Sequence, residues 1–425
     1  IVCKTAEIVV VGGVRRSALI SLSDLNDREM RFAKSGQWWE QDVQRALANN
    51  SVNYKEKPDV GTFMREWLSL YDSKSGERGI YNGLSAKRAV ERLNERYRDG
   101  SGDYIRRRDA REDFGTNPCS EIILRSREFC NLSEVVVRRR DTRESLKAKV
   151  KHATILGTFQ STLTEFKYLS REWKRNCDEE RLLGVSLTGI MDNPLTNGTK
   201  NGLKELLEEL RDVAYETNKE WADRLGIPHA AAITCVKPSG TVSQLVDSAS
   251  GIHARHNPFY IRTVRADNKD PLCKLMQEMG FPNEPDVTKP DHTTVFSFPM
   301  KSPKDAVFRM DMSALEQLEL WKTYQESWCE HKPSVTISVK EDEWVDVAAW
   351  VYENFDSISG ISFLPFSEHV YRQAPYQDCT EEEYNEALEQ MPKNVDWAEL
   401  SKYESQDYTV SSQELACVAG GCEVI

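Results

Sequence analysis

Apolar segments of strand length alternate with longer amphipathic segments along this chain, and this alternation limits its possible folds more than any other feature. The clearest helix is expected over residues 201–226, where Asn201 could cap the first turn and Gly226 could end the last. Short apolar stretches lie on either side of it, at residues 181–192 and 231–246. Strands alternating with helices are typical of an α/β fold with mostly parallel strands, although the pattern does not separate a barrel from an open sheet.

Other segments extend this alternation. The continuous valine run that begins at Ile8 is typical of a strand buried on both faces, and a glycine turn follows it. The spacing of apolar residues predicts a helix at residues 59–72 and a helix or a pair of helices at residues 143–169. Two late strands are expected at residues 334–339 and 358–366. Regular structure is therefore predicted along most of the chain.

Three regions carry weaker patterns. Residues 75–84 are expected to form a glycine-rich loop, and residues 84–113 hold so many charges that we expect them to be solvated. Residues 38–56 are polar and aromatic without a clear period. From Tyr376 onward the chain is acidic and weakly patterned, and its last residues are expected to form a flexible tail.

Length, charge and cysteine content narrow the class of protein. The 425 residues are enough for a large core, and the net charge of −12 argues against a general nucleic-acid binder, which needs a basic face. No segment approaches the roughly 20 apolar residues of a membrane span. Ten cysteines are too few for a disulfide scaffold in a chain of this length, so we expect a reducing, cytoplasmic setting in which cysteines are more often catalytic.

The segment TNPCSEIIL holds an amide, a thiol and a carboxylate at alternate positions. If the segment is extended, Asn117, Cys119 and Glu121 project to the same side. Such a set can orient a substrate hydroxyl, exchange protons with it and attack it at sulfur. The alternative is a turn at Asn117-Pro118 followed by a buried, inert cysteine. This stretch alone leaves both interpretations open.

Three further cysteines suggest thiol chemistry. Cys130 follows Cys119 by eleven residues and could form a disulfide or simply belong to the core. Cys417 and Cys422 form a CxxxxC pair near the chain end, where a mobile dithiol could reduce a disulfide elsewhere by exchange. A zinc site is the alternative, but two cysteines without further ligands fall short of four. The seven histidines show no metal-ligand spacing, so no metal site is predicted.

Two loops have the composition of anion-binding segments. In the first, small residues after an apolar strand expose backbone N–H groups, and a helix start would complete an anion site. This loop comprises Pro238, Ser239, Gly240 and Thr241. In the second, glycines allow close approach and arginines can bind phosphate or a base. That loop comprises Gly12, Gly13, Val14, Arg15, Arg16 and Ser17. Ordinary turns, the second with exposed arginines, remain the alternatives.

Taken together, these segments resemble the catalytic chain of ribonucleotide reductases. The resemblance is greatest to class II, the adenosylcobalamin-dependent kind, near its monomeric ribonucleoside-triphosphate reductase branch. The resembling segments, in family order, are VVVGGVRRSALISLSD, FGTNPCSEIIL, FCNLSEV, LGTFQSTLT, RLLGVSLTGIMD, ITCVKPSGTVSQL and GISFLPFSEHVYRQAPYQ. The chain has no adjacent tyrosine pair like that of class I, and AGGCEVI does not resemble the glycyl-radical segment of class III. The combination therefore favours class II.

The resemblance implies a ten-stranded α/β barrel of two half-barrels around a central finger loop. The barrel domain would span residues 1–395, and residues 396–425 would form a flexible redox tail. It also implies reduction of ribonucleoside triphosphates, or of diphosphates, to 2′-deoxyribonucleotides, with adenosylcobalamin as cofactor. The implied partners are a deoxynucleotide effector and thioredoxin or a similar reductant.

The resemblance also implies a role for each candidate residue. Cys119 would be the thiyl-radical residue that takes the 3′ hydrogen of the ribose. Asn117 and Glu121 would hold the ribose hydroxyls and move the 3′ proton. Cys130 would be one of two cysteines that supply reducing electrons.

The remaining motifs would serve these steps. Cys417 and Cys422 would reduce the active-site disulfide again after each turnover. Residues 238–241 would bind the substrate phosphates, and residues 12–17 would link the specificity effector to the substrate base.

One departure from the family pattern affects the expected activity. The family's other redox cysteine precedes the GGVRR loop on an early strand, whereas here eleven residues precede Gly12 and Cys3 lies too near the loop to match. We therefore expect the resemblance to begin partway into the barrel, an upstream piece to be a possible separate partner, and this chain alone to lack full turnover. Two other functions remain open: a non-catalytic nucleotide-binding regulator, and a protein thiol–disulfide oxidoreductase working through Cys417 and Cys422.

Overall fold

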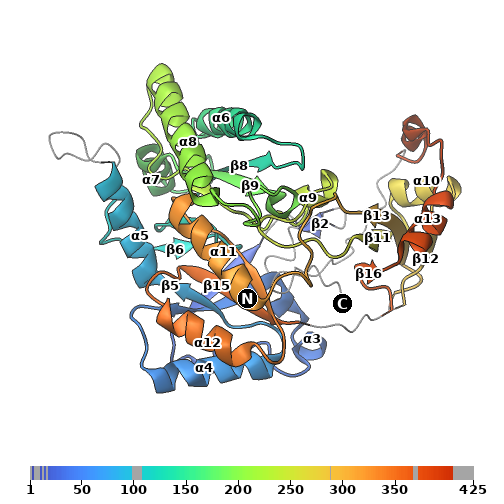
Figure 1. The fold of residues 1–425 in the computed structure, drawn as a ribbon, viewed down its shortest axis with the longest axis horizontal. Helices are drawn as coiled ribbons and strands as arrows, with labels where there is room; N and C mark the ends of the chain where they lie inside the picture. Colours follow the sequence, from blue (N-terminus) through green and yellow to red (C-terminus); the bar gives the residue numbers. More distant parts are fainter. Residues whose placement is uncertain are drawn as a thin grey trace.

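The computed structural model shows a larger α/β body and a smaller antiparallel lobe, which lies at the right in Figure 1. The chain enters the lobe at Phe259, after the loop that contains residues 238–241, and later returns to the body. It enters the lobe again at Tyr376. The residues that the structure describes are 2–3, 10–11, 14–15, 18–97, 108–287, 289–366 and 372–404.

A five-stranded mixed sheet forms one wall of the body. Its strands, in spatial order, are β14 (Thr336–Val339), β15 (Gly360–Pro365), β5 (Gly79–Asn82), β4 (Ala48–Tyr54) and β3 (Leu19–Ser23). The first two strands are parallel to each other, as are the last three, and the two groups meet antiparallel where β15 pairs with β5. Helices α4 (Val60–Ser73) and α12 (Trp344–Glu353) pack together beside this sheet.

A three-stranded parallel sheet forms the other wall. Its order is β10 (Thr234–Cys235), β9 (Leu183–Thr188) and β8 (Asn131–Val136). Every residue of β9 is buried, as expected for a parallel strand covered on both faces. A single parallel bridge between Val236 and Pro333 continues this sheet towards β14.

Helices cover the three-stranded sheet and connect its strands. They are α6 (Arg143–Gln160), α7 (Arg171–Glu180) and α8 (Leu203–Leu225). The short hairpin of β6 (Gly115–Thr116) and β7 (Ile123–Leu124) precedes them and carries the segment with Cys119. The described body is therefore mixed α/β, as expected, while the ten-stranded barrel stays a prediction.

The strongest sequence predictions are confirmed. Helices occupy the segments predicted at residues 59–72 and 143–169, the second as one helix with a Thr142 capping box. The longest helix ends at Gly226, whose φ of 65° is the left-handed conformation that lets a chain leave a helix. Its N-cap is Gly202 rather than the predicted Asn201.

The weakly patterned early regions were predicted wrongly. The segment expected to be a glycine-rich loop contains β5, all of whose residues are buried, and the preceding polar stretch contains β4. Residues 84–113 are not simply solvated. Helix α5 (Gly83–Arg96) buries Ala86, Val90 and Leu93 on one face, a stripe concealed by the surrounding charges.

The smaller lobe is antiparallel, so the expectation of mostly parallel strands is wrong there. Its strands, in order, are β12 (Asn283–Pro285), β13 (Thr293–Lys301), β11 (Phe259–Asp267) and β16 (Tyr376–Asp378). Its helical elements are α10 (Pro271–Glu278), α13 (Glu381–Glu389) and the 3₁₀ helix η4 (Trp397–Lys402). Cys273, Met276, Phe281 and Phe296 form its own small core.

The region after Tyr376 is better ordered than its weak pattern predicted. It supplies β16 to the lobe and then α13, which begins with a capping box between Thr380 and Glu383. The described residues do not test the division of the chain at residue 395, which stays a prediction.

Short elements complete the described chain: β1 (Val10–Val11), β2 (Val14–Arg15), α2 (Arg28–Arg31), α3 (Trp38–Gln41), η2 (Val43–Leu47) and η3 (Ile190–Asp192). Every helix within the described ranges is too short or too polar to cross a membrane.

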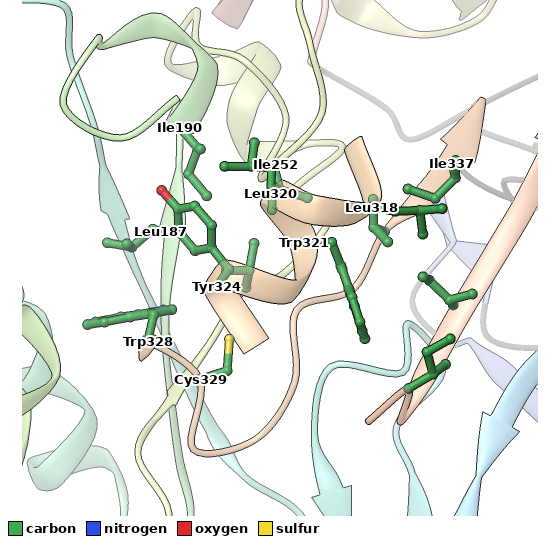
Figure 2. Close-up of a cluster of buried hydrophobic side chains, with 14 of the residues drawn as sticks. Leu187, Ile190, Ile252, Leu318, Leu320, Trp321, Tyr324, Trp328, Cys329 and Ile337 are labelled. Carbon is green, nitrogen blue, oxygen red and sulfur yellow. The ribbon is translucent and has the colours of Figure 1, made fainter. Parts of the chain in front are cut away.

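The core of the body is built around the large side chains of α11 (Ala314–Ser327) and its C-cap, which Figure 2 shows. Trp321, Tyr324 and Trp328 are all fully buried, yet each satisfies its polar atom. The indole of Trp321 donates to Pro333 O at 2.9 Å and that of Trp328 donates to Cys235 O at 2.7 Å. The core therefore holds two backbone segments in place by direct hydrogen bonds as well as by packing.

We predict that Trp321→Ala lowers the free energy of unfolding by about 3–5 kcal/mol, because it leaves a large cavity and an unpaired carbonyl. Urea denaturation followed by circular dichroism measures the change. Trp397→Ala, at a half-exposed indole in the lobe, is the control and is expected to cost much less. Equal losses in the two variants would contradict this assignment of the core.

Candidate active site

The segment that carries Cys119 is a tight turn between β6 and β7. Ser120 has a φ of 64°, and its N–H donates to Asn117 O at 2.8 Å. The Asn117 side chain closes the turn, because its Oδ1 accepts from the N–H of Ile122 at 3.0 Å. Of the two interpretations that the sequence left open, the extended conformation is therefore wrong. The turn itself was the alternative interpretation, but Cys119 is partly exposed rather than buried.

The turn places Glu121 against the loop that contains residues 238–241. Glu121 is fully buried, and its Oε1 lies 3.4 Å from Lys237 Nζ. Its Oε2 is buried and has no hydrogen-bond partner among the described residues. Two motifs that are more than 100 residues apart in the sequence therefore meet at one ion pair.

The pKa of Lys237 is affected by both the carboxylate and the thiol of the turn. Burial lowers the pKa of Lys237, but the charges of Glu121 and then Cys119 outweigh it, so the pKa is raised overall. The lysine is held by its backbone, since its N–H donates to Ser186 Oγ at 2.8 Å. At neutral pH the site therefore contains a fixed ammonium group beside Glu121 and Cys119.

Cys130 lies immediately before β8, near the same carboxylate. Burial raises the pKa of the Cys130 thiol well above its usual value, the Glu121 charge raises it further, and Lys237 opposes the shift. Its sulfur lies against Gly184 of β9, where an added Cβ would be 3.5 Å away. Among the described cysteines none is in a disulfide, so Cys119 and Cys130 are both thiols in this structure.

Glu134 is a second carboxylate of the site that the sequence analysis missed. Burial raises its pKa, the Ser239 hydroxyl and Lys237 lower it, and Glu121 raises it. It lies on β8, four residues after Cys130. A lone acidic residue within an apolar strand was the available signal. Two carboxylates beside one lysine are an arrangement suited to proton exchange.

The second motif forms the expected strand, turn and helix start. It connects β10 to the four-residue helix α9 (Val242–Leu245). Ser239 is buried with a φ of 56°, whereas Gly240 and Thr241 are exposed. Gly251 packs so closely that an added Cβ would lie 2.4 Å from Lys237 O, which explains the glycine there. The loop therefore presents exposed small residues next to the buried ion pair.

Lys332 is the other residue that the sequence analysis missed. It is fully buried, and its Nζ donates to Ser120 Oγ at 2.8 Å. Its position immediately before a predicted strand gave no sign of burial. The turn with Cys119 is therefore contacted by two lysines, Lys237 and Lys332, from different parts of the chain.

The remaining sequence-predicted residues are not tested by the structure. Cys417, Cys422, Gly12, Gly13, Arg16 and Ser17 lie outside the described residues. Val14 and Arg15 form β2, which pairs with β1. In the described ranges, no three side chains of His, Cys, Asp or Glu gather closely enough to hold a metal ion.

Comparison with known proteins gives the chain its relatives. No protein-family model matches it. It is 30% identical over 389 residues to the adenosylcobalamin-dependent ribonucleoside-triphosphate reductase of Euglena gracilis, a match that covers 91% of this chain and 51% of the relative. The enzyme of the same name from Lactobacillus gasseri is 26% identical over 456 residues, covering 98% of this chain and 57% of the relative. The chain thus spans about half the length of the curated relatives it matches.

Solved structures show the same fold. A crystal structure of a B-12 dependent (class II) ribonucleotide reductase matches with a TM-score of 0.71 and 22% identity, over 96% of this chain and 58% of that one. The class Id ribonucleotide reductase alpha subunit of Actinobacillus ureae matches with a TM-score of 0.54 and 14% identity, over 83% of this chain and 72% of that one. The chain is therefore similar in sequence to adenosylcobalamin-dependent ribonucleoside-triphosphate reductases over about half of their length, and it shares the fold of a class II ribonucleotide reductase.

Proposed function

We propose that this chain carries the radical active site of an adenosylcobalamin-dependent ribonucleotide reductase that converts ribonucleoside triphosphates to 2′-deoxyribonucleotides. The observation that carries the proposal is the meeting of Cys119 and Lys237, both partly exposed, with the buried Glu121, in a chain whose relatives bear that name. A decayed nucleotide-binding regulator has no need of this arrangement. A thiol–disulfide oxidoreductase working through the tail does not need it either.

We also propose that the described strands belong to a ten-stranded barrel. Two observations support this. Strands β3, β4 and β5 run parallel, and they meet the parallel pair β15 and β14 in the antiparallel sense expected of two half-barrels. The bridge between Val236 and Pro333 then leads from β14 towards β10, β9 and β8, with the Cys119 turn between the walls.

Cys119 is the proposed hydrogen-abstracting group. As a thiyl radical it takes the 3′ hydrogen atom of the ribose, which forms the S–H bond, breaks the C3′–H bond and leaves the unpaired electron on C3′. Asn117 is proposed to bind the substrate through its side-chain amide nitrogen. Its Oδ1 accepts a hydrogen bond within the turn, whereas the amide nitrogen donates none to the described residues. That nitrogen is therefore available to donate to a ribose hydroxyl.

Glu121 is the proposed proton acceptor for the ribose 3′ hydroxyl. Its buried Oε2 has no described partner, while its other oxygen is held by Lys237. A carboxylate with one oxygen anchored and the other free can take and return a proton without moving. Glu134 and Ser239, beside the same lysine, can pass that proton onward.

Adenosylcobalamin is the proposed cofactor because the relatives are named for it. When bound, it supplies the one-electron chemistry that an amino-acid side chain lacks. The site fits that chemistry at one point: a partly exposed thiol, Cys119, stands at the edge of an otherwise buried polar cluster. None of the described residues is assigned to hold the cobalamin.

Reducing equivalents are proposed to come from thiols. Cys130 is one member of a pair whose oxidation to a disulfide yields two electrons and two protons for replacing the 2′ hydroxyl by hydrogen, with release of water. The partner thiol is not assigned among the described residues. Cys417 and Cys422 then reduce that disulfide by exchange and are themselves reduced by a thioredoxin-like protein.

The first experiment incubates the chain anaerobically with adenosylcobalamin, a ribonucleoside triphosphate and a dithiol. We expect a cob(II)alamin signal by EPR and deoxynucleotide by chromatography. Cys119→Ser is expected to abolish both, because serine cannot form the radical, whereas Cys379→Ser in the smaller lobe retains both. Product from the Cys119 variant, or neither signal from the unsubstituted chain, would contradict the proposal.

A second prediction concerns Glu121→Gln. The amide keeps the shape of the side chain but cannot accept a proton, so product formation should fall by about 10²–10⁴-fold while the cob(II)alamin signal persists. Rapid-quench kinetics and EPR on the same samples measure the two steps. Glu386→Gln, on the exposed face of α13, is the control. An unchanged rate in the Glu121 variant would exclude its proton-accepting role.

A third prediction tests the tail. In the presence of an upstream piece that supplies the partner thiol of Cys130, Cys417→Ser and Cys422→Ser should each abolish repeated turnover with thioredoxin but leave a single turnover intact, because only re-reduction requires the tail. A small dithiol that reaches the site directly should restore repeated turnover. Product counted per chain with each reductant measures the effect. Full turnover of both variants with thioredoxin would show that the tail pair is not the reductant.

A further inference from the structure

The segment Glu330–Ser334, here called the clamp segment, bonds the Cys119 turn at successive residues. Lys332 Nζ donates to Ser120 Oγ at 2.8 Å, and the Lys332 N–H donates to Glu121 O at 3.0 Å. The Ser334 hydroxyl donates to Cys119 O at 2.6 Å. Three consecutive residues of the turn are therefore held by one short segment.

The turn needs such support because of its backbone. Ser120 has a φ of 64°, a left-handed conformation that is unfavourable for a residue with a Cβ. Its own hydrogen bond to Asn117 O closes the turn but leaves the side chain to be fixed from elsewhere. The Lys332 ammonium is the group that fixes it, so this single contact controls the residue next to the thiol.

The surroundings of Lys332 leave its amine little freedom. Its Nζ lies 4.7 Å from the centre of the Tyr81 ring. A Cβ added to Gly360 would lie 2.8 Å from both Lys332 Nζ and Ser120 Oγ, so β15 packs directly against their contact. The absence of a side chain at Gly360 is thus a condition for the lysine and the serine to meet.

A lysine in this place weakens the fold. It is fully buried, and among the described residues no carboxylate oxygen lies within 4.0 Å of its Nζ. Burial lowers the pKa of Lys332 to about 7, although the Glu121 charge opposes the shift. An apolar residue of similar length would avoid that desolvation cost. Its presence therefore points to a role other than stability.

We propose that Lys332 is a positioning residue that, by bonding Ser120, holds the turn and so fixes the direction of the Cys119 thiol. The contact with the turn stands on the geometry alone. Its importance for catalysis rests on the proposed function.

The test compares the full chain with Lys332→Met, Ser120→Ala and the double variant, all without cofactor. Hydrogen exchange of the peptide covering residues 114–125 and alkylation of Cys119 by iodoacetamide are measured by mass spectrometry. Each single variant should raise both rates by about tenfold, the effect of losing one hydrogen bond of ~1.4 kcal/mol. The double variant should add little, because both changes remove the same bond.

Two further variants make the result specific. Gly360→Ala, which pushes on the same contact from β15, should raise both rates while leaving Lys332 and Ser120 in place. Lys304→Met, at an exposed lysine, is the control and should change neither rate. Unchanged rates in Lys332→Met, or faster exchange spread evenly over the chain, would overturn the proposal.

The dependence of stability on pH reports the protonation of Lys332. The folded pKa of about 7 lies below the ordinary 10.5, so between these values the unfolded chain retains a proton that the folded chain has released. The contribution of Lys332 to stability therefore rises with pH over this window. The titratable groups facing the amine are Glu121 and Tyr81, and both remain in Lys332→Met. The urea midpoint of the unsubstituted chain should rise relative to that variant, and parallel pH profiles would overturn the buried placement.

Product formation separates this inference from the proposed function. If exchange and alkylation change as expected but the unsubstituted chain yields neither cob(II)alamin nor deoxynucleotide, the proposed function fails and the turn contact stands. If product forms at the same rate in Lys332→Met and the unsubstituted chain, the proposed function stands and the positioning role is overturned. A lower kcat with an unchanged KM in Lys332→Met is the result expected when both hold.

Discussion

The buried contact between Glu121 and Lys237 is the interaction around which the site is organised. It brings a hairpin turn of one segment against the loop that follows a strand of another, and it places a cation next to a thiol. Glu121 is fully buried, whereas the Lys237 side chain is about one third exposed, so the carboxylate depends on the lysine for much of the solvation it has lost. This ion pair therefore helps to set the position of the turn relative to the exposed Gly240 and Thr241.

The hydrophobic core and the polar site share backbone. The indoles of Trp321 and Trp328 donate to the carbonyls of Pro333 and Cys235. Pro333 lies within the clamp segment, and Cys235 lies just before Lys237. Since packed interiors transmit displacement with little loss, a change in the aromatic cluster should be felt at the ion pair. Activity and stability are thus expected to be coupled through α11, whose large side chains form the core (Figure 2).

The sequence predicted what depends on local spacing and residue type. The helix at residues 201–226 was found because its apolar stripe is long, whereas the stripe within residues 84–113 was concealed by charge. The two motifs of the site were identified, and a turn at Asn117-Pro118 was one of the two interpretations of the first motif. The contact between Glu121 and Lys237 was not predicted, because the two motifs are more than 100 residues apart in the sequence. Glu134 and Lys332 were missed because a lone charge in or beside a strand usually faces solvent. Only the tertiary fold buries them.

The contacts that complete the site link residues far apart along the chain. Lys332 and Ser120 are separated by 212 positions, and Ser334 and Cys119 by 215. During synthesis at about 5–20 residues per second, the turn with its thiol emerges roughly 10–40 s before the segment that fixes it. The hairpin that carries Cys119 cannot complete the site before the later segment has been synthesised. Cys119 and Cys130 therefore spend the early life of the nascent chain without their final enclosure, at a time when reactive thiols are most open to oxidation.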